Sequence, residues 1–217
     1  MELSLAFSSL SELRILSPID IVTKWVNFAV QRGVQYIDLY VGNRSKLPIS
    51  ILTCTTLVVL KIDNFIMEKG FPPVTLPSLK TLHLNNISFP QHRDFMLFIA
   101  GCPILENLLT FDVLFDSVVS LTCEEWENFS LPNLTTANID GCRNQYREHF
   151  PLKVVHNVSS LRLEIGQDYL GDFIPTFHNL TKLDFVCSSL NNNWELVVEV
   201  LKHCPKLQKL RLSEFVR

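Results

Sequence analysis

Six histidines and an acidic run at Glu124, Glu125 and Glu127 are the residues whose types suit acid–base catalysis or metal binding. Their spacing supports neither chemistry. No two histidines form a His-x-x-x-His arrangement, which would place two imidazoles on one helical face, and carboxylates such as Glu124 are favoured where a helix begins. The chain also lacks a Gly-x-Ser-x-Gly elbow, a Walker loop and a dinucleotide-binding fingerprint. The sequence therefore predicts no enzyme activity, no cofactor and no metal site.

Six cysteines and six Asn-x-Ser/Thr sequences bear on the compartment in which the protein works. The cysteines lie singly along the chain, without the clustered pairs of a disulfide framework, so we expect reduced and partly buried thiols. Asn-x-Ser/Thr sequences accept glycans only in a secreted chain, and the first residues lack the positive flank and cleavage site of a signal peptide. The sequence predicts a cytoplasmic or nuclear protein with unmodified asparagines.

Charge and hydropathy exclude two classes of partner. The net charge is -3 and the isoelectric point is about 6.1, so no overall field attracts nucleic acid or an anionic membrane surface. No apolar run approaches the roughly 20 residues that a membrane-spanning helix needs. We expect neither nucleic acid nor a membrane as a partner.

An apolar pattern recurs along the chain every 22 to 29 residues: one apolar residue, a second three positions later and a third two positions after that. The last two residues of each triplet point the same way from a short strand, and the residues around them point the other way. A single unit cannot bury its apolar edge, so successive units must stack with their strands parallel. The nine triplets are Leu10/Leu13/Ile15, Val34/Ile37/Leu39, Leu57/Leu60/Ile62, Leu79/Leu82/Leu84, Leu105/Leu108/Thr110, Leu134/Ala137/Ile139, Val158/Leu161/Leu163, Leu180/Leu183/Phe185 and Leu207/Leu210/Leu212.

This pattern predicts an α/β fold, a leucine-rich-repeat solenoid. It should be a curved horseshoe fragment with parallel strands on the concave face and helices or irregular segments on the convex face. We expect one domain over residues 1–217 with about nine repeats. A continuous asparagine ladder along the core is not expected, because the asparagine that often follows the third apolar residue by three is mostly missing.

Four returning segments carry helix signals: residues 17–33, about 91–100, a segment that starts at Thr122, and about 193–203. In the first, Ser17 suits the N-cap, Pro18 the first helical position and Gly33 the left-handed residue after the end. The third starts with a capping box to Glu125. In the first segment, one helical face carries the apolar residues Ile21, Val22, Trp25, Phe28 and Ala29.

The outward positions of the strands form the candidate protein-binding surface, because a few aromatic and charged side chains usually dominate binding. In the fifth repeat, a slip of the strand by one residue would bury Leu109 and Phe111 and expose Leu108 and Thr110. The candidate residues on the concave face are Tyr36, Asp38, Tyr40, Lys61, His83, Asn85, Leu109, Phe111, Asn138, Arg162, Asp184 and Arg211.

Four stretches have distinctive residue patterns: Trp25-Val26-x-x-Ala29-Val30-x-x-Gly33-Val34, Leu76-Pro77-Ser78-Leu79-x-x-Leu82, Gly101-Cys102-Pro103-Ile104-Leu105-Glu106 and His203-Cys204-Pro205-Lys206-Leu207. With these stretches the chain resembles the plant F-box proteins that carry leucine-rich repeats and often a following FBD domain. In that family the F-box binds a Skp-type adaptor of a cullin ubiquitin ligase and the repeats select the substrate. The resemblance therefore implies a substrate-recognition region with an unknown protein substrate.

Residues 1–217 contain no Leu-Pro-x-x-Leu-Leu opening of an F-box and no complete FBD domain. We therefore expect a Skp-type adaptor as a partner only if a longer product carries an F-box. Two interpretations stay open beside the ligase subunit: an adaptor-independent intracellular leucine-rich-repeat binding protein, and a truncated F-box-family product without ligase function.

Overall fold

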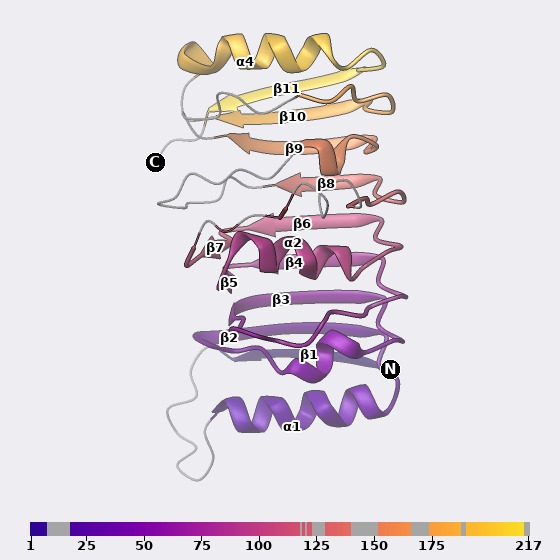
Figure 1. Ribbon diagram of the computed structural model, residues 1–217, viewed down its shortest axis with the longest axis vertical. Coiled ribbons are helices and arrows are strands. Elements are labelled where there is room, and N and C mark those ends of the chain that lie inside the picture. The colour runs from indigo at the N-terminus through magenta and orange to yellow at the C-terminus, as the bar shows by residue number, and fades with distance from the viewer. Residues whose placement is uncertain are drawn as a thin grey trace.

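The computed structural model describes residues 1–7, 18–117, 119, 121–122, 129–139, 152–165, 174–187 and 190–214. Its main feature is an 11-stranded sheet whose hydrogen-bonded order is β1-β2-β3-β4-β6-β8-β9-β10-β11, and every described pairing is parallel. Figure 1 shows these strands stacked in sequence order. The strands are β1 (Glu2–Phe7), β2 (Tyr36–Lys46), β3 (Val59–Ile66), β4 (Thr81–Asn85), β5 (Ser88–Phe89), β6 (Asn107–Phe111), β7 (Leu114–Phe115), β8 (Thr136–Ile139), β9 (Ser160–Ile165), β10 (Lys182–Cys187) and β11 (Lys209–Glu214).

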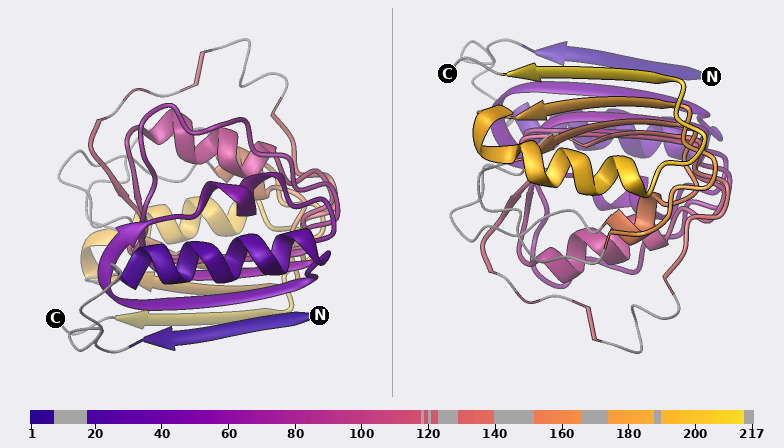
Figure 2. Two further views of the ribbon diagram at one scale, coloured as in Figure 1. Left: turned by 90° about the horizontal axis from the view of Figure 1, so that it is seen from below. Right: turned by 90° about the horizontal axis from the view of Figure 1, so that it is seen from above.

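The returning segments cover one face of the sheet and leave the other face open. They include α1 (Pro18–Gln31), η1 (Ile49–Thr53), α2 (His92–Ala100), η2 (Leu152–Val155) and α4 (Leu190–Lys202). In the end-on views of Figure 2 the three α-helices lie on the same side, and the end strands β1 and β11 extend beyond the middle strands on the open side. The open face is therefore concave, and the predicted leucine-rich-repeat solenoid is confirmed.

The predicted triplets form the core between the sheet and the returning segments. From the second triplet to the eighth every member is at most 3% exposed, including the polar Thr110. In the fifth repeat Leu108 and Thr110 are buried and Phe111 is exposed, so the strand has the unslipped register. The ninth triplet differs, because β11 is an edge of the described sheet: Leu210 and Leu212 are 42% and 41% exposed.

The strand that neighbours β2 is not the one that the first triplet predicted. The triplet Leu10/Leu13/Ile15 lies outside the described residues, and the strand beside β2 is Glu2–Phe7. Leu3 and Leu5 of β1 pair in register with Ile37 and Leu39 and pack against the core. The alternation of these two leucines is enough for an edge strand, because such a strand has a neighbour on one side only.

Three of the four expected helices are present with shifted ends, and the segment from Thr122 to Glu125 falls mostly outside the described residues. The segment from Pro18 is α1, and Gly33 has a φ of 69°, as the left-handed position requires. α2 ends before Gly101, whose φ of -69° is ordinary. Gly101 is needed for space instead, because a Cβ there would clash with the backbone carbonyl of Val74.

Only part of the apolar face of α1 is buried. Val22, Val26 and Ala29 are buried, whereas Trp25 and Phe28 are 44% and 56% exposed. The spacing of Val22, Val26 and Ala29 already fills the stripe that faces the core, and α1 lies at one end of the stack (Figure 1). The two aromatic side chains therefore lie outside the packed interface, where the Arg32 guanidinium sits 4.8 Å from the centre of the Phe28 ring.

The four described cysteines, Cys54, Cys102, Cys187 and Cys204, are buried thiols that form no disulfide in the described part of the chain. Burial raises the pKa of the Cys102 thiol to about 12 and that of the Cys204 thiol to about 11. These thiols behave as small apolar core residues. No helix in the described part of the chain is long and apolar enough to cross a bilayer.

Candidate protein-binding surface

The parallel register aligns the outward side chains of the strands into rows across the concave face. Residues two apart on a strand share a face, and register partners lie side by side on neighbouring strands. One row crosses the sheet from β2 to β11 and contains eight of the twelve candidate residues. In order these are Asp38, Lys61, His83, Leu109, Asn138, Arg162, Asp184 and Arg211.

A shallow groove of about 510 Å³ lies on this face over β2, β3, β4, β6 and β8. Seven candidate residues meet in it: Asp38, Lys61, His83, Asn85, Leu109, Phe111 and Asn138. Asp63 also lines the groove, and its outward register on β3 is the sequence signal that identifies it. Tyr36 and Tyr40 occupy neighbouring outward positions on β2, whereas Arg162, Asp184 and Arg211 lie farther along the face.

Three side chains at the β2 end hold one another in place. The Tyr36 hydroxyl donates a hydrogen bond of 3.2 Å to Oδ2 of Asp38. The Lys61 ammonium group lies 5.5 Å from the centre of the Tyr36 ring, within the range of a cation–π contact. This end of the groove therefore presents an ordered aromatic ring with a positive charge beside it.

His83 lies in the middle of the groove and is half-buried. Burial lowers the pKa of His83 below its ordinary value of 6.5, and the nearby Lys61 charge lowers it further, while Asp38 acts in the opposite direction. The imidazole is therefore neutral near pH 7, with one nitrogen as a donor and the other as an acceptor. His83 offers hydrogen bonds to a ligand rather than a positive charge.

Asp63 is the second titratable group in the groove whose pKa is shifted by its surroundings. Burial raises the pKa of the Asp63 carboxyl above 3.8, and a hydrogen bond of 2.6 Å from Nδ2 of Asn85 to Oδ2 of Asp63 partly offsets this. The Asn85 amide therefore stabilises the carboxylate form, and both side chains are fixed across β3 and β4.

Apolar side chains line the groove beside these polar groups. Leu109 is half-buried, and Phe111, two residues later on the same strand, is exposed. Exposed aromatic side chains on an otherwise polar face are the residue type that anchors protein interfaces. Groups of three or more histidine, cysteine or acidic residues able to hold a metal do not occur among the described residues.

The far part of the row is charged. Nη1 of Arg162 lies 2.8 Å from Oδ2 of Asp184, an ion pair between β9 and β10. Arg211 is the register partner of Asp184 on the other side. The concave face thus changes character along the sheet, from an apolar and hydrogen-bonding groove to a charged surface.

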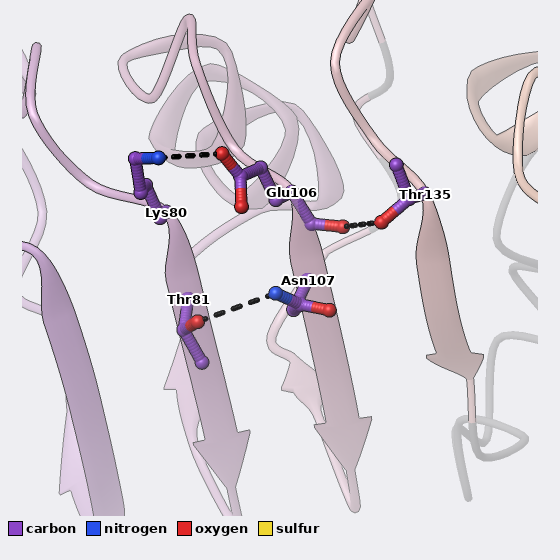
Figure 3. A network of polar contacts seen from close by, with 5 residues as sticks. All are labelled: Lys80, Thr81, Glu106, Asn107 and Thr135. Atoms are coloured by element: carbon purple, nitrogen blue, oxygen red, sulfur yellow. Dashed lines mark hydrogen bonds and ion pairs between the residues drawn. The ribbon is translucent and has the colours of Figure 1, made fainter.

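Polar contacts at the start of the strands fix the frame that carries the groove. Lys80 and Glu106 form an ion pair of 2.8 Å between neighbouring repeats, and the Thr135 hydroxyl donates to the Glu106 backbone carbonyl at 3.1 Å. Nδ2 of Asn107 approaches Oγ1 of Thr81 at 3.5 Å (Figure 3). These contacts resist sliding of one strand past the next.

A short asparagine ladder at the other end of the strands was not predicted. Asn64 and Asn86 have φ values of 71° and 51°, and Nδ2 of Asn86 donates to Oδ1 of Asn64 at 2.9 Å. Arg44 donates to Oδ1 of Asn86 at 2.5 Å. The ladder stands two residues after the third apolar position instead of three, and asparagine tolerates the left-handed backbone that Asn64 and Asn86 adopt there.

Comparison with known proteins gives the family. The family model described as "FBD-associated F-box protein At5g56370, LRR repeats" matches residues 22–131. The chain belongs to this family of F-box leucine-rich repeats. The matched segment runs from α1 into the residues before β8, so it contains most of the groove, whereas Arg162, Asp184 and Arg211 lie beyond it.

The curated relatives come from Arabidopsis thaliana. FBD-associated F-box protein At3g52670 is 28% identical over 94% of this chain and 55% of its own length. F-box/FBD/LRR-repeat protein At4g00160 is 28% identical over 92% of this chain and 53% of its own length. F-box/FBD/LRR-repeat protein At1g51370 is 36% identical over 42% of this chain and 21% of its own length. The chain thus spans about half the length of the relatives that match most of it, and no solved structure matches it.

Proposed function

We propose that the concave face is the substrate-recognition surface of an F-box subunit of a cullin ubiquitin ligase. The observation that carries the proposal is the groove of about 510 Å³, which collects ordered polar side chains and the apolar Leu109 and Phe111 on the open face of the sheet. Family membership supplies the ligase context, since the matching relatives are F-box proteins. Contact with a Skp-type adaptor requires an F-box in a longer product, and the substrate is an intracellular protein.

Site-specific cross-linking tests the surface. A photoreactive side chain at Asn138, on the groove, should capture the same protein from plant extract as one at His83, because both positions face the same ligand. Phe111→Ala combined with Leu109→Ala should reduce that capture by about tenfold, the effect of removing two interface anchors. Lys153 on η2, on the opposite side of the sheet, provides the matched control position. Capture from Lys153 that survives while capture from both groove positions is absent would refute the proposal.

The fate of the captured protein tests the ligase context. The captured protein should accumulate when the proteasome is inhibited, and the effect should disappear with the Phe111→Ala and Leu109→Ala variant.

We propose that the protein is located in the cytoplasm or nucleus, so mass spectrometry of native material should find unmodified Asn133 and Asn179. A glycan on either asparagine would contradict this location.

A further inference from the structure

The geometry points to an extended acidic peptide as the ligand of the concave face, with an apolar side chain beside Leu109 and Phe111 and carboxylates against Lys182, Lys209 and Arg211. This inference rests on the proposed function and specifies the chemistry of the segment that is recognised. We call Lys182, Lys209 and Arg211 the basic cluster.

The basic cluster places like charges directly side by side. Lys182 and Lys209 are register partners on β10 and β11, and both side chains are exposed. Like charges opposite one another destabilise a sheet. The chain as a whole is negative, with a net charge of -3, so the cluster runs against its general charge. A surface that keeps this repulsion is suited to a ligand that relieves it.

Partners distinguish these cations from the others on the strands. Arg44 donates to Asn86 and Ser88, Lys46 pairs with Glu68, Lys61 lies over Tyr36, and Arg162 pairs with Asp184. Within the described residues, Lys182, Lys209 and Arg211 have no ion pair, hydrogen bond or aromatic contact through their side chains. Their positive charges are therefore available to a partner molecule.

The neighbouring Asp184 does not neutralise the cluster. Its Oδ2 is engaged by Arg162 at 2.8 Å, and its buried Oδ1 has no hydrogen-bond partner in the described structure. In register, Asp184 lies between Arg162 and Arg211, so one carboxylate faces two guanidinium groups. The three strands β9 to β11 keep a positive excess on their outward face.

The arrangement of the charges favours spaced carboxylates over a single phosphate or a nucleic acid. Neighbouring strands are about 4.8 Å apart, and residues two apart on one strand are about 7 Å apart. Three separate point charges at this spacing match several acidic side chains. Single-stranded nucleic acid stacks its bases on aromatic side chains, and among the described strand residues the outward aromatic side chains Tyr36, Tyr40 and Phe111 lie on β2 and β6, away from the cluster.

The sheet spacing also sets the spacing of the ligand. From β6 with Leu109 to β10 and β11 there are three and four strand steps, which is about 14 to 19 Å. An extended chain advances about 3.3 to 3.6 Å per residue. The apolar anchor and the acidic group of the ligand should therefore stand about four to six residues apart.

Fluorescence anisotropy with synthetic peptides tests the inference. The probes carry a Leu-Phe anchor and three glutamates separated by about one, five or ten residues, in both chain directions, with glutamine versions as controls. We expect the glutamate peptide with the middle spacing to bind most tightly. Lys182→Glu combined with Lys209→Glu should weaken it by about tenfold at low salt and by less at high salt. The neutral pair Lys182→Gln and Lys209→Gln should weaken it by a smaller factor.

Matched controls separate the possible failures. Lys69→Glu combined with Lys153→Glu changes the net charge equally, away from the concave strands, and should leave binding within about twofold. Three results would each overturn the inference. They are equal affinity for glutamate and glutamine peptides, no binding of any glutamate peptide, and tighter binding of a uridine RNA oligomer that is lost in the variant with Lys182→Glu and Lys209→Glu. If groove cross-linking still captures a protein in that event, the proposed function stands and only the acidic ligand is wrong.

Discussion

Replacing Leu82 by alanine tests the repeat register directly. Leu82 is the middle residue of its triplet, is completely buried and has Leu60 and Leu108 as register partners. Removing three carbons at about 0.8 kcal/mol per buried CH₂ lowers the free energy of unfolding by about 2.4 kcal/mol. The cavity between two fixed neighbours adds to this, so we expect a loss of about 2 to 5 kcal/mol. Leu183, which is 2% exposed, should fall in the same range.

Leu210→Ala is the matched control, because Leu210 holds the same position in the ninth triplet but is 42% exposed on the edge strand β11. Scaling the transfer free energy by the buried fraction gives about 1.4 kcal/mol, without a closed cavity. Urea denaturation followed by circular dichroism measures all three variants against the unmodified chain. Equal losses for Leu82→Ala and Leu210→Ala, or unchanged unfolding of Leu82→Ala, would show that the register is wrong.

Three further predictions concern local features. Gly101→Ala should destabilise the chain by about 1 to 3 kcal/mol through the clash with Val74. Gly70 has open space around it but a φ of 72°, so Gly70→Ala should lower the stability by only about 1 kcal/mol, through backbone strain. Equal losses would refute the steric explanation. Asn86→Gly should lose less stability in urea than Asn86→Ala, because both remove the side-chain hydrogen bonds and only alanine strains the left-handed φ; the reverse order would contradict this. Burial lowers the pKa of His92 to about 4 from 6.5, so on acidification the unfolded chain is protonated at His92 before the folded chain is. The contribution of neutral, buried His92 to stability is therefore complete above about pH 6.5 and is lost as the pH falls towards 4. His92→Phe should flatten that part of the stability profile, and an unchanged profile would contradict the assignment.

The core and the outward rows could be predicted from sequence because they depend on alternation alone. Ile37 and Leu39 are two apart, so both must enter the same core, and Asp38 between them must face outward. Parallel stacking then gives the corresponding residues of each repeat the same orientation. The register of Leu108 in the fifth repeat needed the structure, since Leu109 and Phe111 are as apolar as the residues that they would have replaced.

Features at the end of the stack could not be predicted in this way. Trp25 and Phe28 follow the apolar periodicity of α1, yet they are exposed because α1 packs on one side only. Leu3 and Leu5 form the strand beside β2, where the triplet pattern predicted Leu13 and Ile15 instead. Apolar periodicity predicts burial for residues of a repeat that has a neighbouring repeat on both sides, whereas a unit at the end of the described sheet has only one neighbour.

The candidate residues divide for a related reason. Sequence register placed His83 and Leu109 side by side in one row, as the structure does. It could not show which charges pair, because pairing depends on side-chain rotamers. Arg162 reaches Asp184, whereas Lys182 and Lys209 have no partner among the described residues, and only the structure separates the engaged cation from the available ones.

Shared backbone acceptors explain the regular register and the hydroxyl residue in three of the six Asn-x-Ser/Thr sequences. The Glu106 carbonyl accepts hydrogen bonds from the backbone N–H and the hydroxyl of Thr135, at 2.9 and 3.1 Å. Ser159 repeats this arrangement on the Thr135 carbonyl, and Thr181 repeats it on the Ser159 carbonyl. A hydroxyl residue is therefore favoured next to the first core residue of these repeats. In three repeats an asparagine precedes that core residue, so the Asn-x-Ser/Thr pattern follows from the sheet itself and requires no glycan.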